Sequence, residues 1–226
     1  MLPSAEEVQR GLPRPVGIGI RPADGLEASV PPLYPIEAEA LGPRAVEKRR
    51  VLFALGRAAA RDALGALGMQ NAAIPRTNSG APVWPDGFVG SISHSDEAAI
   101  AVVGRRHDYL GLGVDLEERG RGLSARAARL VCRPSEMAWV DVESGTERLL
   151  RLFSAKEAIF KALFPIEEVW LGFADAELSW HAEAGGFFEA RVLKSVGDGF
   201  SEGFSLKVNS TVGPTWVLST AFVETG

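Results

Sequence analysis

The chain has 226 residues, which is enough for one large domain or for two small lobes that share a core. With 46% hydrophobic residues, 23% charged residues and a formal net charge of −5, it has the balance of a soluble globular protein, and its overall charge disfavours nucleic acid as a partner. No apolar run approaches the ~20 residues of a membrane span, and the N-terminus lacks the apolar stretch of a signal peptide. The single cysteine, Cys132, excludes an internal disulfide and a thiolate-rich zinc site.

The sequence also lacks the motifs of several common enzyme classes. It contains three histidines, no HExxH pair and no GxxxxGK[ST] loop. We therefore expect a cytoplasmic protein whose chemistry depends on carboxylates that hold a hard metal ion, or on arginines and lysines that hold phosphate.

The first elements expected are a short strand and a long helix. Residues 1–35 are rich in Pro and Gly, with "GIGIRP" as a candidate strand. A helical period extends from Glu37 to about Leu67, where Gly42-Pro43 should separate a short first helix from the main one and Gly68 is suited to cap the main helix. Basic residues are concentrated on this helix in an otherwise acidic chain: Arg44, Lys48, Arg49, Arg50, Arg57 and Arg61. They predict either a phosphate-binding face or an ordinary solvated helix face.

A Gly- and Pro-rich loop at residues 71–90 leads into "GSISHS" and the buried strand "AAIAVVG". The hydroxyl of Ser93 and the imidazole of His94 are both able to donate to a phosphate. A Ser–His–Asp triad built on His94 and Asp96 is the rival interpretation, which we disfavour because His94 and Asp96 are almost adjacent in the sequence.

The next strand, "YLGLGVDLEE", carries a carboxylate pair. Alternation places Asp115 and Glu117 on one face beside two glycines, ~6–7 Å apart at Cα, and the backbone carbonyl of Leu116 lies between them. This arrangement suits Mg²⁺, which takes oxygen ligands and keeps sites for water and phosphate. The alternative is a solvated acidic strand end.

Residues 122–164 are expected to be mostly helical, and "ERLLRLFSAKEAIFKALF" is the best amphipathic helix, which Pro165 should stop. Ser154, Glu157 and Lys161 lie on one helical stripe. Taken alone, the stripe is also explained by an ordinary Glu–Lys pair worth ~0.2–0.5 kcal/mol. Alternating runs after this helix predict a strand-rich tail, so the order of elements indicates an α+β protein of two lobes.

Taken together, these segments are similar to a known enzyme family. "GVDLE" followed by "FSAKEAIFKAL" resembles the paired signature of the 4′-phosphopantetheinyl transferase superfamily. "KRRVLFALGRAAAR", "IPRTNSGAPVWPDGFVGSISHS" and "LGFADAEL" resemble its larger, pseudodimeric class, in particular the enterobactin-type and mycobacterial-type branch. The resemblance covers about residues 44–178, in the same order.

The resemblance implies two similar lobes related by a pseudo-twofold, each a small antiparallel sheet packed on a long helix, with coenzyme A in the cleft between them. We expect the lobes to be residues 1–110 and 111–226. The implied metal is Mg²⁺, with Mn²⁺ as an alternative, and the implied ligands are Asp115, Leu116, Glu117 and Glu157. The implied catalytic residues are Asp115, Glu157 and Lys161.

The implied coenzyme A contacts follow the same correspondence. Arg49 and Arg57 would grip the nucleotide end, residues from Arg76 through Thr77 and Asn78 to Ser79 would line the adenine side, and Ser93 and His94 would contact the 3′-phosphate region. Lys161 would hold the pyrophosphate, with Lys156 beside it, and Leu171 would pack by the cofactor.

The expected reaction transfers 4′-phosphopantetheine from coenzyme A to a serine of an acyl or peptidyl carrier protein and releases 3′,5′-ADP. The expected partner is such a carrier, docked near residues 120–145, and the expected state is a monomer. A Mg²⁺-dependent phosphohydrolase and a non-catalytic module that binds coenzyme A or a carrier stay open as alternatives.

Overall fold

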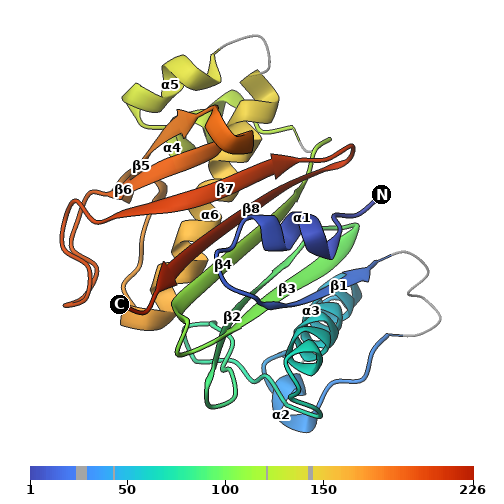
Figure 1. The fold of residues 1–226 in the computed structure, drawn as a ribbon. Helices are drawn as coiled ribbons and strands as arrows, with labels where there is room; N and C mark the ends of the chain where they lie inside the picture. Colours follow the sequence, from blue (N-terminus) through green and yellow to red (C-terminus); the bar gives the residue numbers. More distant parts are fainter. Residues whose placement is uncertain (24–29, 43, 121, 142–144) are drawn as a thin grey trace.

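The protein combines helices with antiparallel sheets (Figure 1). The computed structural model describes residues 1–23, 30–42, 44–120, 122–141 and 145–226. The first half of the chain contains α1 (Ala5–Arg10), β1 (Gly17–Pro22), α2 (Pro35–Ala38), α3 (Glu47–Ala66), β2 (Phe88–His94) and β3 (Ala98–Arg105). The second half contains β4 (Tyr109–Glu118), α4 (Ala125–Val131), α5 (Pro134–Val140), α6 (Gly145–Glu167), η2 (Phe173–Asp175), β5 (Ala176–His181), η3 (Glu183–Gly185), β6 (Phe187–Val192), β7 (Ser205–Val212) and β8 (Trp216–Glu224).

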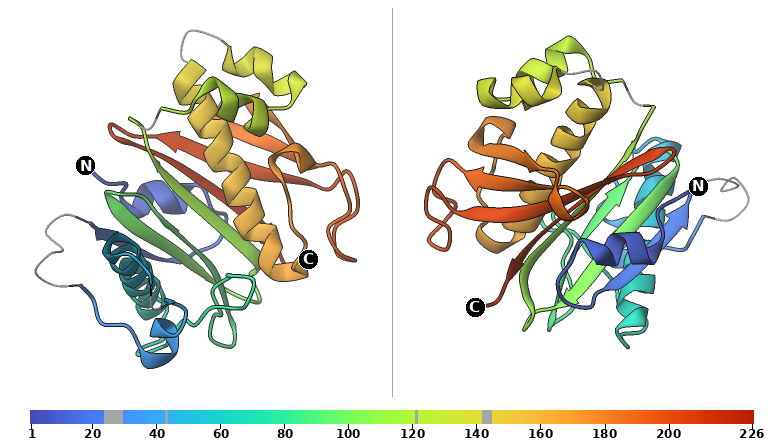
Figure 2. Two further views of the ribbon diagram at one scale, coloured as in Figure 1. Left: turned by 180° about the vertical axis from the view of Figure 1, so that it is seen from behind. Right: turned by 45° about the horizontal axis from the view of Figure 1, so that its top comes forward.

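The strands form two sheets, each packed on one long helix. The three-stranded sheet has the order β1-β3-β2 and packs against α3, whereas the five-stranded sheet has the order β4-β8-β7-β6-β5 and packs against α6. Every pair is antiparallel. In Figure 2, α6 lies along the five-stranded sheet, with α4 and α5 near its N-terminal end. The two sheets fit the expectation of two lobes.

Glycines bring the first long helix close to its sheet. A Cβ added at Gly17 would lie 1.9 Å from the carbonyl oxygen of Ala63, and one at Gly19 would lie 1.9 Å from that of Ala59. Any larger residue at these two positions of β1 would push α3 away, so the glycines set the distance between strand and helix.

The second long helix approaches β4 in the same way. A Cβ at Gly111 would lie 2.2 Å from the carbonyl oxygen of Ala162, and one at Gly113 would lie 1.9 Å from that of Ala158. The space that these two glycines leave beside the carboxylate pair is therefore occupied by the backbone of α6.

A third core joins the two sheets. Val8 of α1 and Leu12 pack with apolar residues from β3, β4 and β8, including Ile100, Val114 and Leu218. Figure 1 shows α1 lying across the strands of this region. The inward side chains of β4 that alternation predicts, Leu112, Val114 and Leu116, all belong to this core.

Several predicted elements are confirmed, and the expectation that Pro165 ends the last long helix is wrong. The strands "GIGIRP", "AAIAVVG" and "YLGLGVDLEE" are present, and Gly68 follows α3 with φ +86°. Pro165 does not stop α6, which continues for two more residues to Glu167. The N-terminal 35 residues also contain α1, whose capping box joins Ser4 and Glu7.

The boundary near residue 110 and the pseudo-twofold relation stay predictions. Within the described residues, no helix has the length and hydropathy of a membrane span.

Candidate active site

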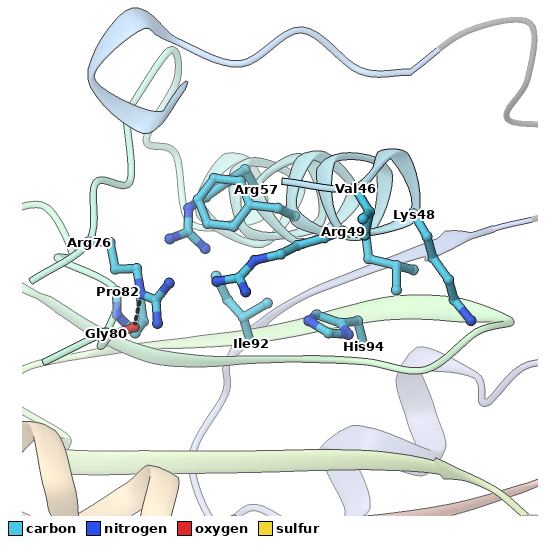
Figure 3. Close-up of a pocket in the computed structure, with 12 residues that line it drawn as sticks. Val46, Lys48, Arg49, Arg57, Arg76, Gly80, Pro82, Ile92 and His94 are labelled. Atoms are coloured by element: carbon cyan, nitrogen blue, oxygen red, sulfur yellow. Dashed lines mark hydrogen bonds between the residues drawn. The ribbon is translucent and has the colours of Figure 1, made fainter. Parts of the chain in front are cut away.

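A basic pocket lies between α3 and β2. It has a volume of about 520 Å³, and its lining includes Arg49, Arg57, Arg76 and His94. Figure 3 shows the guanidinium groups of Arg49 and Arg57 directed from α3 toward the strand that carries His94, with Arg76 approaching from the loop. The structure thus brings together four residues predicted to contact coenzyme A, in a pocket whose charge suits a phosphate.

Arg57 is the most buried cation of this pocket. Its side chain lies over the ring of Phe53, with the guanidinium carbon 4.3 Å from the ring centroid, and its Nε has no hydrogen-bond partner among the described residues. Burial lowers the pKa of Arg57 to about 10, although the charge of Glu37 opposes that shift. A buried cation with incomplete hydrogen bonding favours an anion that enters from the pocket.

His94 stands at the mouth of the same pocket and keeps exposed surface. The protein around the imidazole displaces water and lowers its pKa, and the positive charge of Lys161 lowers it further. A phosphate would oppose this lowering of the pKa, because it would supply negative charge beside the ring.

The loop after α3 forms a tight turn that carries the predicted adenine-side residues. Arg76 donates from Nε to the Gly80 carbonyl at 2.9 Å, and Thr77 Oγ1 accepts from the backbone N–H of Gly80 and of Ala81. Arg76 also lines a second pocket of about 260 Å³, together with Ser79. Asn78 and Thr77 line a separate pocket of about 440 Å³, which Arg76 also borders.

The carboxylate of Asp115 meets Lys161 beside this second pocket. Lys161 Nζ lies 2.6 Å from Asp115 Oδ1, and the Asp115 side chain is almost fully buried. Ser154 also reaches this part of β4, since its hydroxyl donates to the Asp115 carbonyl at 3.4 Å. The strand and the helix that carry the predicted catalytic residues therefore pack against each other at this point.

Glu157 occupies the stripe of α6 between these two contacts. It lies one turn after Ser154 and one turn before Lys161, both of which touch Asp115. Glu117 is two residues from Asp115 on the same face of β4, and it is buried. Glu117 and Glu157 both have interactions within the protein.

The oxygen atoms around Asp115 are suited to hold a divalent ion. Asp115 Oδ2 is buried and has no hydrogen-bond partner among the described residues, so one carboxylate oxygen is available as a ligand. The Leu116 N–H points to β2, so its carbonyl is directed to the same side, away from β8. Within the described part of the chain, no ready group of three His, Cys, Asp or Glu side chains exists, but Mg²⁺ needs only one or two carboxylates beside phosphate and water oxygens.

A third pocket of about 170 Å³ continues from the second. The two pockets share Phe160 and Trp170 as walls, and the third is also lined by Glu157 and by Leu171, which is buried. Because Arg76 joins the first pocket to the second, the three form a series from the basic end to an apolar end.

Lys156 borders the third pocket, but its ammonium group is turned into the protein. Nζ donates to Glu136 Oε2 at 2.7 Å and to the carbonyls of Val131 and Phe173 at 2.8 and 2.9 Å. All three hydrogens of the ammonium are therefore used. Its predicted contact with coenzyme A stays a prediction, while the geometry supports a structural role.

Sequence reasoning missed two buried carboxylates and one aromatic wall. The carboxylate of Glu37 accepts hydrogen bonds from Arg61 and from the backbone N–H of Ile74. The carboxylate of Glu136 accepts hydrogen bonds from Lys156 and from the backbone N–H of Leu178. The only sequence signal for them is a glutamate at the third position of a short helix, which is typical of a capping box. Trp170, which is 68% exposed, has no local signal that distinguishes it from a surface tryptophan.

Comparison with known proteins matches both halves of the chain to one superfamily. Residues 37–104 match the 4′-phosphopantetheinyl transferase N-terminal domain, and residues 111–210 match the 4′-phosphopantetheinyl transferase superfamily. A solved holo-ACP-synthase from Plasmodium yoelii aligns with 52% of this chain and 96% of its own, at 14% identity and a TM-score of 0.39, which is too weak to carry a conclusion.

Curated relatives are similar over most of the chain. The 4′-phosphopantetheinyl transferase Svp of Streptomyces mobaraensis is 41% identical over 71% of this chain and 66% of its own length. The 4′-phosphopantetheinyl transferase PptT of Mycobacterium tuberculosis is 38% identical over 74% of this chain and 76% of its own. Enterobactin synthase component D of Salmonella typhi is 33% identical over 51% of this chain and 48% of its own.

These matches agree with the basic pocket, the Asp115–Lys161 pair and the helical Glu–Lys stripe, and the chain belongs to the 4′-phosphopantetheinyl transferase superfamily and is an enzyme of that class.

Proposed function

We propose that this chain transfers the 4′-phosphopantetheine moiety of coenzyme A to a serine of an acyl or peptidyl carrier protein, with release of 3′,5′-ADP, in the groove formed by the three pockets. The observation that carries the proposal is the order of the three adjoining pockets along the groove. It places arginines at one end, the Asp115–Lys161 pair near the middle and an apolar pocket at the other end. Coenzyme A has the same order of parts: a phosphorylated nucleotide, a diphosphate and an uncharged pantetheine arm.

Each part of the groove has a proposed role. Arg49, Arg57 and His94 bind the phosphorylated nucleotide, since their charges and donors face one pocket. The turn that contains Arg76 and Ser79 lines the base. Leu171, together with Phe160 and Trp170, packs against the pantetheine arm.

The metal ion would be held by Asp115, Glu117 and the Leu116 carbonyl, with Glu157 nearby. When bound, Mg²⁺ supplies charge neutralisation for the diphosphate oxygens. Mn²⁺ is an alternative ion for the same oxygen ligands.

The chain's own side chains account for the remaining chemistry. Glu157, directly or through water, accepts the proton of the carrier serine as its oxygen attacks the β-phosphorus. Lys161, held at the diphosphate end by Asp115, offsets the negative charge that develops on the departing 3′,5′-ADP. Positioning and charge neutralisation are the main requirements of phosphoryl transfer, and both are met here by fixed groups.

The two lobes are proposed to be related by a pseudo-twofold. Both contain a strand with two glycines packed against alanine carbonyls one turn apart on a long helix, as at Gly19–Ala59 and Gly113–Ala158. The cleft between the lobes then has one catalytic set, because only β4 and α6 carry the carboxylates.

A carrier-docking surface is proposed at α4. Residues 119–135 contain five arginines and no acidic residue, although the whole chain has a net charge of −5. Arg126 and Arg129 are exposed, and Leu130 between the charges is 65% exposed. This surface suits an acidic carrier helix with an apolar contact, and we expect one chain to act as a monomer.

The test is mass spectrometry of an apo carrier protein incubated with the chain, coenzyme A and Mg²⁺. The carrier should gain one phosphopantetheine arm, and a carrier with its acceptor serine changed to alanine should gain none. Release of phosphate or phosphopantetheine without a carrier would instead indicate a phosphohydrolase, and binding without transfer would indicate a non-catalytic module. The variant Asp115→Ala should give no labelling, and normal labelling by it would remove the metal role of Asp115.

A further inference from the structure

Two serines of β2 join the edge of one sheet to the edge of the other. The backbone N–H of Val114 donates to Ser91 Oγ at 3.0 Å, and the backbone N–H of Leu116 donates to Ser93 Oγ at 3.1 Å. Within the described residues, β2 and β4 belong to different sheets, so side-chain hydroxyls take the place of a backbone ladder at this junction. Both serines are buried.

Ser93 makes two further contacts that Ser91 lacks among the described residues. Its hydroxyl donates to Asp115 Oδ1 at 3.2 Å, and its oxygen accepts from Lys161 Nζ at 3.0 Å. A serine hydroxyl offers one donor and two acceptor sites, so Leu116, Lys161 and Asp115 use all of them. The side chain has no capacity left for a phosphate oxygen.

Strand alternation separates Ser93 from the nucleotide pocket. Ile92 and His94 line that pocket, whereas Ser93 points to the opposite face of β2, toward β4. The predicted direct contact between Ser93 and coenzyme A is therefore poorly supported, while its neighbour His94 is well placed for one.

The position of Ser93 determines how Asp115 is oriented. Ser93 and Lys161 both bind Oδ1, and this fixes the carboxylate so that Oδ2 is the oxygen without a partner among the described residues. Ser93 also belongs to the strand that carries His94, so one hydroxyl connects the nucleotide-binding lobe with the metal-binding carboxylate and the lysine of the other lobe.

We infer that Ser93 is a positioning residue, which holds Asp115 and Lys161 in register with the nucleotide pocket through its hydroxyl. This inference rests on the proposed function. Groups that hold a metal ligand in place typically change metal affinity or activity by about 10–100-fold when they are removed. Ser93 should behave in this way through its hydroxyl, whose donor and acceptor sites are all used within the protein.

The structure offers a matched control for the experiment. Ser91→Ala and Ser93→Ala each remove one hydroxyl that accepts from β4, at nearly equal distances and burial, but only Ser93→Ala removes the contacts to Asp115 and Lys161. Ser93→Thr keeps the hydroxyl and serves as the conservative variant. Three measurements are made on each full-length variant: thermal unfolding, Mn²⁺ affinity of the free protein by electron paramagnetic resonance, and carrier-labelling kinetics.

Both alanine variants should unfold at lowered temperatures, because each leaves a backbone N–H of β4 without its acceptor. Ser93→Ala should bind Mn²⁺ about tenfold more weakly than Ser91→Ala and lower kcat by about 10–100-fold, with a much smaller change in KM for coenzyme A. Ser93→Thr should recover most of the Mn²⁺ affinity.

Equal Mn²⁺ affinity and equal kcat in the two alanine variants would overturn the inference. So would a Ser93→Ala variant whose defect lies only in KM for coenzyme A, because this result would indicate a direct ligand contact. Failure of the wild-type chain to label any carrier would instead overturn the proposed function, and the Mn²⁺ comparison would still decide the role of Ser93.

Discussion

Arg21 of β1 and Asp62 of α3 form an ion pair, with Nε and Nη2 of the arginine 2.5 and 2.7 Å from the two carboxylate oxygens. In the other lobe, Asp115 of β4 and Lys161 of α6 form an ion pair at 2.6 Å with the charges exchanged. Arg21 and Asp115 each lie two residues after the glycine that packs on its helix, so strand and helix are joined at the same level in both lobes. One pair is a surface clamp, and the other belongs to the proposed catalytic site.

Exchange of the charges within the surface clamp should be tolerated. The double variant Arg21→Asp, Asp62→Arg should unfold within about 1 kcal/mol of wild type, because both side chains are partly exposed and such pairs contribute little. It should also label carriers normally, as measured by urea unfolding and mass spectrometry. The corresponding double variant Asp115→Lys, Lys161→Asp should lose labelling, and retained labelling would show that this second pair is also only a clamp.

Replacement of Arg57 should weaken coenzyme A binding while it stabilises the free protein. Arg57 is buried with an unpartnered Nε, so Arg57→Met removes a desolvated charge and should raise the unfolding temperature by about 2–4 °C. Loss of charge-assisted hydrogen bonds should raise the coenzyme A dissociation constant by about 10–100-fold. Calorimetry measures the binding, and Arg14→Met, at an exposed ion pair, is the control. An unchanged dissociation constant would move Arg57 out of the binding site.

Substitution of Glu157 should separate catalysis from binding. Glu157→Gln keeps the shape of the side chain but removes the proposed base, so kcat should fall by about 10²–10⁴-fold. The dissociation constant for coenzyme A should change by no more than a small factor. Single-turnover labelling and calorimetry provide the two values, with Glu202→Gln as an exposed control. Equal losses in both measurements would argue against a base.

Lys156 should prove to be a stabilising residue. Lys156→Met leaves the buried carboxylate of Glu136 without its cationic partner and should cost about 3–5 kcal/mol of unfolding free energy. The double variant Lys156→Met, Glu136→Gln should recover part of this loss, since the remaining amide oxygen still accepts the N–H of Leu178. If the recovered double variant binds coenzyme A as wild type does, Lys156 makes no direct contact, whereas a large loss of affinity would place it in the binding site.

The stability of the free protein should depend on the protonation of His94. Its pKa lies below the ordinary value of 6.5, so between these two values the unfolded chain binds more protons than the folded chain. Stability should therefore fall as the pH decreases through 6.5 toward the lower pKa of the folded state. Urea unfolding of His94→Asn should show a flatter dependence, and 3′,5′-ADP should bind more tightly to wild type at the lower pH. Parallel curves for the two proteins would mean that His94 does not titrate in this range.

Much of the fold follows from local patterns. Alternation predicts the strand with Asp115 and places Leu112, Val114 and Leu116 in the core, because side-chain direction in a strand has a period of two. The helical stripe of Glu157 and Lys161 follows from the helical period in the same way. Pro165 is an exception to the local rule that a proline ends a helix, since α6 extends two residues beyond it.

The sequence by itself determined the family, the basic helix, the carboxylate strand and the Glu–Lys helix, because each is a short-range pattern of residue types and spacing. Only the tertiary structure decided that Ser93 binds Asp115 and Lys161, which lie 22 and 68 residues away, and that the ammonium group of Lys156 is buried against Glu136. A serine in a strand has no local signature of its partners. Its role depends on which sheet edge, helix and carboxylate the packing of the two lobes brings to its hydroxyl.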